Sequence, residues 1–177
     1  MRPILFLCLL LSLVISNSVK ANTDVSNSIN EPTVWTLAGS PYVINTSYSN
    51  YASFSVNAEL TIEEGVEVHS TDHLVIRSGG KLNADGVTFT IGSPTQSYDF
   101  KVEGGEINIT NSSIDGSAFY LKNEGSGVLR NNSIVMNRII VDGKGSALST
   151  YTLSENSYSN GAFEIVNSID VPTSLDV

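Results

Sequence analysis

"VIRSGGKLNADGVTF" at residues 75–89 and "KVEGGEINITNSSI" at residues 101–114 follow one pattern. In both segments, alternating apolar residues lead into a pair of glycines, and a charged residue, an aliphatic residue, a polar turn and a β-branched residue follow. Self-similarity at a period of about 20–50 residues is the sequence signature of stacked repeats. The two segments therefore indicate a fold built from similar units.

The same pattern extends to both sides of these segments. The related turns are "SVNAEL" (55–60), "IRSGGKL" (76–82), "VEGGEI" (102–107), "NEGSGVL" (123–129) and "DGKGSAL" (142–148). Their final aliphatic residues form a first column of Leu60, Leu82, Ile107, Leu129 and Leu148. A second column beyond each turn consists of Val66, Val87, Ile114, Ile134 and Leu153. A third column ahead of each turn consists of Val56, Ile76, Val102, Leu121, Val141 and Ile165.

Residues alternate with period two around the third column. Phe100 and Val102 fall on one side of this alternation, which we expect to face the core. The residues expected to face outward are Ser55, Val75, Lys101, Tyr120 and Ile140. Period-two alternation in short segments is a strand signal, whereas no sustained helical period follows the N-terminal segment.

Three short strands in each repeat of about 22 residues correspond to one coil of a solenoid. A single coil cannot bury its inward face, so neighbouring coils must stack. We therefore predict an all-β fold, a parallel β-solenoid of about 5–6 coils with three short strands per coil. The glycine pairs 79–80 and 104–105 supply turns with φ > 0. Asn111 and Asn132 occupy similar places in successive coils and are candidates for hydrogen bonding along the axis.

The N-terminus resembles a secretory signal peptide. Arg2 is followed by an apolar run from Ile4 to Ile15, and small residues precede a cleavage site after Ala21. This run is shorter than the roughly 20 residues that a membrane-spanning helix needs. We therefore predict a signal peptide at 1–21, no membrane span in the mature chain, and a secreted or cell-surface location.

Removal of this segment changes the charge and the cysteine content. Loss of Arg2 and Lys20 leaves seven basic and eighteen acidic residues, a net charge of −11, and Cys8 is lost as well. Such an acidic chain repels phosphate backbones, so we expect no nucleic-acid partner. Without disulfides, the domain must be stabilised by core burial or bound ions.

The stretch "ELTIEEGVEVH", followed by "LVIRSGGKLNADGVTFT", at residues 59–90 resembles the opening coils of secreted pectin-lyase-like β-helix proteins. The resemblance extends over about residues 54–165 and implies the right-handed parallel β-helix. It also raises a polysaccharide lyase or hydrolase as an alternative activity. We divide the chain into the signal peptide (1–21), a flexible N-terminal segment (22–32), an N-terminal cap region (33–53), the parallel β-helix (54–171) and a C-terminal tail (172–177).

A lyase or hydrolase needs carboxylates and a basic residue on one outer face. Candidate bases are Arg77, Lys101 and Lys122, which recur near the third strand of consecutive coils. Candidate carboxylates are Glu63, Glu64, Glu67, Asp72, Asp85, Asp99, Glu103, Glu106 and Asp115. We expect these residues to form a solvated outer face, and we assign no catalytic, cofactor-binding or metal-binding residue.

The sequence also contains residue types that bind metal ions. His69 and His73 flank Asp72, and Glu67 is the one evident further ligand of a metal site. Histidines at the ends of strands commonly point into solvent without binding a metal ion, so we assign no metal site here. The turns at 63–64 and 142–145 are weak Ca²⁺ candidates. We predict no cofactor.

The function expected from these features is that of a non-catalytic extracellular or cell-surface β-helix protein with a structural or adhesive role. The alternative is a carbohydrate-binding or carbohydrate-active β-helix, including a fragment of a longer protein. Expected partners are polysaccharide or cell-envelope components, with self-association through the C-terminal coil.

Overall fold

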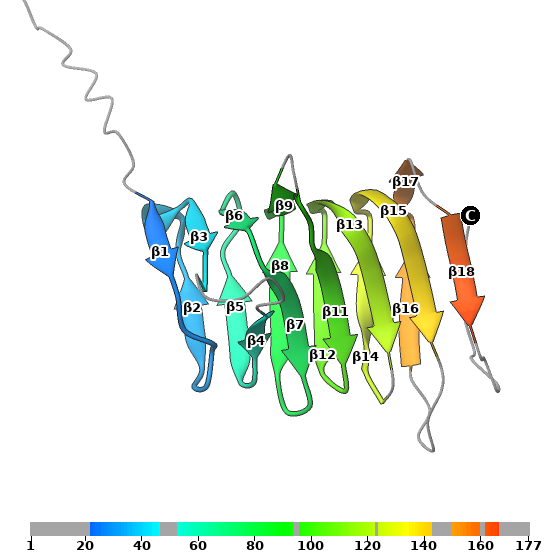
Figure 1. Ribbon diagram of the computed structural model, residues 1–177, viewed down its shortest axis with the longest axis horizontal. Helices are drawn as coiled ribbons and strands as arrows, with labels where there is room; N and C mark the ends of the chain where they lie inside the picture. Colours follow the sequence, from blue (N-terminus) through cyan, green and yellow to red (C-terminus); the bar gives the residue numbers. More distant parts are fainter. Residues whose placement is uncertain are drawn as a thin grey trace, which may run out of the picture.

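The computed structural model describes residues 22–46, 53–93, 96–122, 124–142, 150–159 and 162–166. This part of the chain forms a parallel β-solenoid of about five turns. Its strands lie side by side along the long axis, and the chain passes from one end of that axis to the other (Figure 1). The predicted all-β solenoid is confirmed. The predicted signal peptide at 1–21, the tail at 172–177 and Leu148 lie outside the described residues.

One wall of the solenoid is a six-stranded sheet in which all neighbours are parallel. Its strands are β2 (Thr33–Trp35), β5 (Glu59–Ile62), β8 (Lys81–Asp85), β12 (Glu106–Thr110), β14 (Ser126–Arg130) and β16 (Thr150–Ser154). Inward and outward residues alternate along the strands, so that β5, β8 and β12 contribute apolar side chains to the interior and mainly polar side chains to the outer face.

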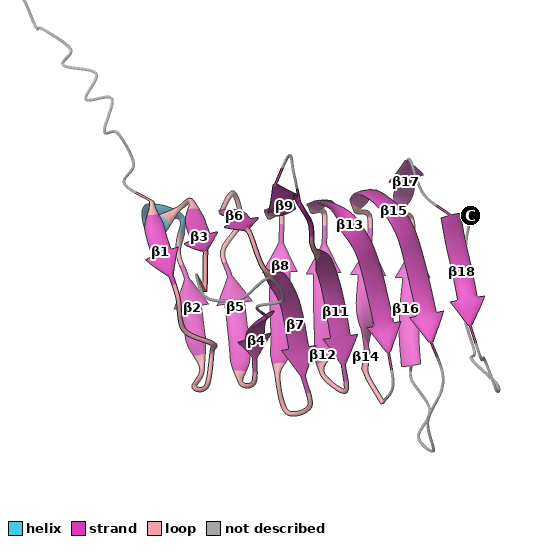
Figure 2. Ribbon diagram, viewed as in Figure 1, coloured by secondary structure: helices cyan, strands magenta, loops and turns pink. Residues whose placement is uncertain are grey.

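The remaining strands form a twelve-stranded sheet with two arms. One arm contains β1 (Thr23–Val25), β3 (Tyr42–Ile44), β6 (Glu67–Ser70), β9 (Thr88–Ser93) and β17 (Ser157–Ser159), with β10 (Gln96–Ser97) in an antiparallel hairpin on β9. The other arm contains β4 (Ser53–Val56), β7 (His73–Arg77), β11 (Asp99–Glu103) and β18 (Ala162–Val166). Two longer strands, β13 (Ser113–Lys122) and β15 (Ser133–Asp142), join the arms. Short loops connect most consecutive strands (Figure 2), and one 3₁₀ turn, η1, spans Leu37–Gly39.

The prediction of three separate strands per coil is wrong, because the coils contribute to two parallel sheets. β13 and β15 each continue for ten residues. The first residues of β13 pair with β9 and its last residues pair with β11. In the earlier coils, the turn between β6 and β7 and the hairpin of β9 and β10 interrupt the same path. In β13 and β15 neither interruption is present, so each strand runs from one arm of the sheet into the other and its backbone pairs with strands of both arms.

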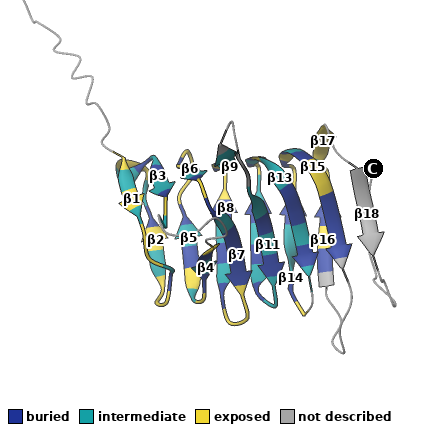
Figure 3. Ribbon diagram, viewed as in Figure 1, coloured by how far each residue is buried: buried dark blue, intermediate teal, exposed yellow. Residues whose placement is uncertain are grey.

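The third predicted column is confirmed throughout. Val56, Ile76, Val102, Leu121, Val141 and Ile165 pair in succession across neighbouring strands. The preceding inward positions also stack, and they include Phe54, Leu74, Phe100 and Phe119, which are buried. Figure 3 shows buried segments along β7, β11 and β13. This aromatic and aliphatic stack forms the centre of the core.

The other two columns are correct only in part. Leu60, Leu82 and Ile107 stack as predicted, but Gly127 and Tyr151 continue their column. Leu129 belongs two residues further along, with Ile109 and Leu153. In the second column, Ile114 and Ile134 stack on Val68 and Phe89 instead of on Val66 and Val87. Alignment on the aliphatic residue nearest each glycine fails at Leu129, because Gly127 itself occupies the inward position in that turn.

The N-terminal end of the core is covered by aromatic rings. Trp35 and Tyr42 are both buried and stack with a centroid distance of 4.6 Å, and Trp35 also contacts Phe54. Both residues lie in strands of the solenoid within the segment predicted as a cap region at 33–53. The segment predicted to be flexible, 22–32, contains β1 and an isolated bridge from Ile29 to Val56, so its backbone is hydrogen-bonded to the next turn.

A buried polar ladder lies at the corner between the six-stranded sheet and the following strands. Asn132 is 2% exposed; its Oδ1 accepts the Ser112 N–H at 2.9 Å, and its Nδ2 donates to the Ile109 carbonyl at 2.9 Å. Asn156 continues the ladder by accepting the Asn132 N–H at 3.0 Å. The predicted pairing of Asn111 with Asn132 is therefore wrong by one residue: Asn111 pairs with Asn131 through an exposed hydrogen bond of 2.7 Å.

The same corner has a left-handed backbone in the five turns that follow β5, β8, β12, β14 and β16. The residues with this conformation are Gly65, Gly86, Asn111, Asn131 and Glu155, with φ between 52° and 78°. Glycine and asparagine tolerate this backbone conformation, whereas for other residues it is less favourable by roughly 1–2 kcal/mol of free energy. Glu155 is therefore the member of this set with an unfavourable residue type.

Replacing Glu155 with asparagine is expected to raise the free energy of unfolding by about 0.5–1 kcal/mol, because asparagine tolerates φ of 57° better than glutamate. Urea denaturation of the two proteins measures the change. Glu155→Ala is the matched control, since alanine removes the carboxylate without relieving the backbone. Equal effects of the two substitutions on the free energy of unfolding would show that the charge of Glu155, and not its backbone conformation, destabilises this turn.

Candidate functional site

The predicted stack of basic residues lies on the outer face of β7, β11 and β13. Arg77 and Lys122 occupy one row across these strands, and Glu103 lies between them on β11. Lys101 lies in the adjacent outward row, opposite Val75 and Tyr120. The structure therefore places the three basic residues on neighbouring strands, as the sequence predicted, but in two rows.

Carboxylates are interleaved with these cations. Glu103 forms ion pairs with Arg77 and, at 3.8 Å, with Lys122. Asp99 contacts the Lys101 ammonium at 3.1 Å. The Tyr120 ring lies between the two lysines, whose ammonium nitrogens are 5.8 Å and 5.1 Å from its centroid. The three basic groups are thus held in a fixed network.

His73 lies at the edge of this network. Its Nδ1 is 3.0 Å from the Asp99 backbone nitrogen and 3.3 Å from Asp99 Oδ2. The first contact requires Nδ1 to accept a hydrogen bond and the second requires it to donate one. Burial, and then the nearby Lys101, lower the pKa of His73 from its ordinary value. We therefore assign a neutral ring whose Nδ1 accepts the Asp99 N–H.

The structure does not bring the predicted metal candidates together. His69 contacts Glu67 at 3.4 Å on the surface, whereas His73 faces Asp99. Asp72 is buried, and its Oδ2 accepts the backbone N–H of Thr46 at 2.5 Å and the Thr46 hydroxyl at 2.7 Å. Within the described ranges, no three His, Cys, Asp or Glu residues are grouped so that they could hold a metal ion.

The weak calcium candidates are also separated. Glu63 Oε2 accepts the Leu37 N–H at 2.9 Å, whereas the Glu64 side chain lies over Gly86. The second candidate turn, 142–145, lies outside the described residues after Asp142. The two glutamates of the first turn therefore serve different contacts in the fold.

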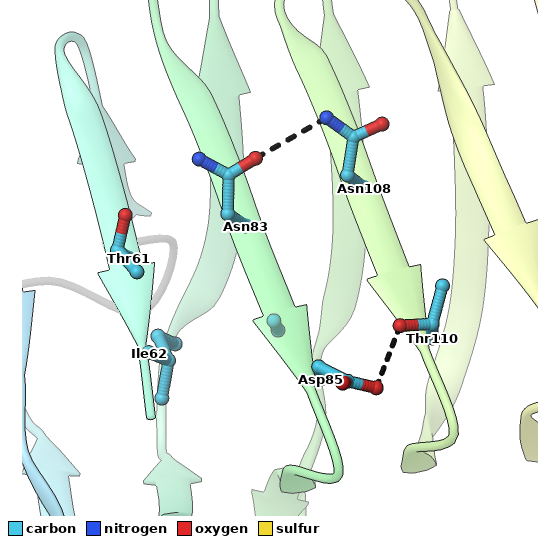
Figure 4. A pocket seen from close by; sticks show the side chains of 7 residues that line it. Thr61, Ile62, Asn83, Asp85, Asn108 and Thr110 are labelled. Atoms are coloured by element: carbon cyan, nitrogen blue, oxygen red, sulfur yellow. Dashed lines mark hydrogen bonds between the residues drawn. The ribbon is translucent and has the colours of Figure 1, made fainter. Parts of the chain in front are cut away.

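A shallow depression of about 250 Å³ lies on the outer face of the six-stranded sheet. Figure 4 shows that its labelled side chains come from the three adjacent strands β5, β8 and β12. The lining residues are Thr61, Ile62, Asn83, Ala84, Asp85, Asn108 and Thr110. Its walls thus present hydroxyl, amide and carboxylate groups over an aliphatic floor.

The amides of this depression form a directional chain. Asn108 Nδ2 donates to Asn83 Oδ1 at 3.2 Å, and Asn83 Nδ2 donates to Glu59 Oε1 at 2.8 Å. Asp85 Oδ1 accepts the Thr110 hydroxyl at 2.7 Å (Figure 4). The hydrogen bonds from Thr110 and then from Asn111 lower the pKa of Asp85 below its ordinary value. Glu106 is held in the same way by Lys81, which contacts it at 2.9 Å and is the main cause of its lowered pKa.

The hydrogen-bond partners indicate what chemistry the depression supports. Asp85, which lines it, accepts hydrogen bonds from Thr110 and Asn111 as an ionised carboxylate and is poorly suited to act as a general acid. The arrangement is suited to binding a ligand that donates hydrogen bonds.

The sequence prediction included Asp85 and Glu106 but missed Asn83, Asn108 and Thr110. A signal for the two asparagines was present: each lies three residues beyond a glycine pair, in "GGKLN" and "GGEIN". Because the two turns are equivalent, this spacing places both amides in the same outward row.

No family model, no curated protein and no solved structure matches this chain. Among the residues that the structure describes, no helix has the length and apolar character needed to cross a membrane. The class of protein is therefore given by the architecture, a parallel β-solenoid.

Proposed function

We propose that this chain is a non-catalytic extracellular or cell-surface solenoid with a structural or adhesive role. The observation that carries the proposal is the chain of polar side chains on the six-stranded sheet, in which Asn108, Asn83 and Glu59 are linked across three consecutive turns. Such a surface is continuous along the axis and suits an extended partner. The predicted signal peptide at residues 1–21 supports a location outside the cytoplasm.

Export tests the location. We expect the full chain, produced in a secreting host, to be recovered outside the cytoplasm with Asn22 as its first residue. Cell fractionation followed by N-terminal sequencing measures this. A chain that remains in the cytoplasm and retains Met1 would contradict the proposal.

We also expect no polysaccharide cleavage, because Asp85, the carboxylate of the depression, is engaged in hydrogen bonds with Thr110 and Asn111, and the basic groups of the other face are engaged in ion pairs. Incubation with pectin, alginate and glycosaminoglycans, with and without Ca²⁺, provides the measurement. The appearance of unsaturated or new reducing ends would show that the chain is a carbohydrate-active enzyme.

A second candidate function, carbohydrate binding, is favoured by the depression between β5, β8 and β12. Its amides and carboxylate match the hydroxyl groups of a sugar chain. If this function is correct, Asn108→Ala weakens binding of a neutral polysaccharide by about tenfold, the effect of losing roughly one strong hydrogen bond. Asn57→Ala is the matched control, since Asn57 also bonds to an asparagine of the neighbouring turn but lies outside the depression.

A further inference from the structure

The hydrogen bonds around the depression on the six-stranded sheet fix the direction of its two amides. An ionised carboxylate accepts hydrogen bonds and cannot donate them, so Asn83 Nδ2 has to face Glu59 Oε1, which lies 2.8 Å away. Asn83 Oδ1 then faces Asn108, whose Nδ2 donates to it at 3.2 Å and to Glu106 Oε1 at 3.1 Å. Figure 4 shows the Asn108 nitrogen turned toward Asn83 and its oxygen turned away. Both N–H groups of Asn108 are therefore engaged within the protein.

Acceptor atoms of the depression remain available. Asp85 receives its two hydrogen bonds, from the Thr110 hydroxyl at 2.7 Å and from Asn111 Nδ2 at 2.6 Å, on Oδ1 alone. No residue of the described ranges donates a hydrogen bond to Asp85 Oδ2 or to Asn108 Oδ1. The open groups are thus mainly acceptors, and a ligand bound here has to supply the donors.

The charges of this sheet favour a donor that is positively charged. The charged residues of its six strands are Glu59, Lys81, Asp85, Glu106 and Arg130. Lys81 contacts Glu106 at 2.9 Å, and the turn after β5 adds two further glutamates at 63–64. Arg130 lies two strands from Asp85, with Thr110 between them. Acidic groups thus outnumber basic groups around the depression, and Asp85 is the charged residue that lines it.

The size and floor of the depression suit one ring of a longer chain. Its volume of about 250 Å³ is below that of pockets that enclose a drug-sized ligand, and it is shallow. Ile62 and Ala84 contribute the aliphatic floor, and polar side chains form the rim. A sugar ring has C–H groups on its faces and hydrogen-bonding groups at its edge, so its shape and polarity match.

We propose that the depression binds an amino sugar of a linear polysaccharide, with the ammonium group of the sugar donating to Asp85 Oδ2 and its ring over the aliphatic floor. A primary ammonium supplies three N–H donors and a positive charge, whereas a hydroxyl group supplies one donor and no charge. This ligand is a specific case of the carbohydrate binding described above as the second candidate function, and depends on it.

Isothermal titration calorimetry of the purified protein with glucosamine, N-acetylglucosamine and glucose oligomers of equal length and the same linkage tests the proposal. Mildly acidic solution keeps the ammonium protonated. Asp85 stays ionised there, because the hydrogen bonds from Thr110 and then from Asn111 lower its pKa. We expect the glucosamine oligomer to bind about tenfold or more tightly than either uncharged oligomer.

Asp85→Asn is expected to weaken binding of the glucosamine oligomer by about tenfold and to change binding of the glucose oligomer less than about threefold. Asp115→Asn is the matched control, since Asp115 is also an exposed aspartate in a strand but belongs to the other sheet. Its effect is expected to be less than about twofold. Arg130→Gln removes a cation near Asp85 and is expected to tighten binding by about twofold, a gain that a misfolded protein would not show.

The uncharged oligomers separate the possible failures. If the glucose oligomer binds as tightly as the glucosamine oligomer, the amino-sugar proposal is wrong and carbohydrate binding stands. If none of the oligomers binds, both are wrong, whereas the structural or adhesive role is tested separately by export. Because the chain has a net charge of −9, equal losses in Asp85→Asn and Asp115→Asn would indicate a general attraction for cations and would overturn the proposal.

Discussion

Replacing Phe100 with alanine is expected to lower the free energy of unfolding by about 3–5 kcal/mol. Phe100 is fully buried in the central turns, and its ring contacts Phe119 at a centroid distance of 4.7 Å and Phe89 at 5.8 Å. It also pairs with Leu74 on the preceding strand, so the ring joins consecutive turns. In a solenoid, stability comes from interfaces between neighbouring turns. A cavity at this place therefore weakens the contact with the turn on each side.

Urea denaturation followed by circular dichroism measures the loss. Phe100→Leu serves as the control, because leucine keeps most of the apolar volume, and its expected cost is below about 1.5 kcal/mol. The difference between the two variants isolates the volume that the ring fills. If both variants unfold at the same urea concentration as the unchanged protein, Phe100 is not in the core and the register of β11 is wrong.

The register around Phe100 could be predicted because two signals agree there. The first signal is the alternation of inward aromatic and aliphatic residues with outward residues such as Lys101 and Tyr120. The second signal is the turn that follows each alternating segment and usually contains glycine. A slip of one residue would turn Phe100 and Val102 to solvent, so burial alone fixes the register. Pairing of the third column is accordingly as predicted from Val56 to Ile165.

The joining of the arms could not be predicted from the alternation alone. "SIDGSAFYLK" at 113–122 contains a glycine and two serines, which read as a turn between two strands. In the structure, Gly116 pairs with Met136 inside one continuous strand, and the glycine accommodates Ile91 and Met136 close to its backbone. Whether glycine ends a strand or allows close packing within it depends on the neighbouring turns, which a local pattern does not contain.

The candidate site was predicted unevenly for a similar reason. The basic residues at 77, 101 and 122 were found, because charged residues in outward positions are conspicuous. The hydrogen-bonded pair of Asn83 and Asn108 in the depression was missed, because a single asparagine in a strand does not by itself indicate a binding or catalytic role. Only the register between β8 and β12 brings these amides together into one surface.

Replacing Gly127 with alanine is expected to cost about 3 kcal/mol or more, because strain and overpacking act together. Gly127 occupies the inward position between Ile107 and Tyr151, where the aliphatic column was predicted to continue. Its φ is 146°, and a Cβ there would lie 1.8 Å from the Ile107 carbonyl oxygen. The partner of such a clash is backbone in the neighbouring turn, so relief requires the two turns to separate.

The packing of Tyr151 accounts for the glycine in the turn ahead of β14, the strand that pairs with β16. The ring is 2% exposed, and its hydroxyl contacts the Lys122 carbonyl at 3.3 Å, beside the backbone of Gly125. Gly125 leaves the room that the tyrosine fills, because a Cβ there would lie 2.0 Å from the Tyr151 hydroxyl oxygen, and burial raises the pKa of this hydroxyl above the ordinary value. An alanine at 127 would push β14 away from β12, and β16 pairs with β14 on its other side.

Gly79→Ala is the matched control for Gly127→Ala in urea denaturation. Gly79 also has a left-handed backbone, with φ of 83°, but the nearest atom to an added Cβ is 3.8 Å away. Its substitution therefore carries conformational strain alone, about 1 kcal/mol. The excess cost at Gly127 measures the close approach of two turns. Equal costs at the two positions would mean that β14 does not pair with β12 in the register described, and that Leu129 instead continues the column of Leu82 and Ile107.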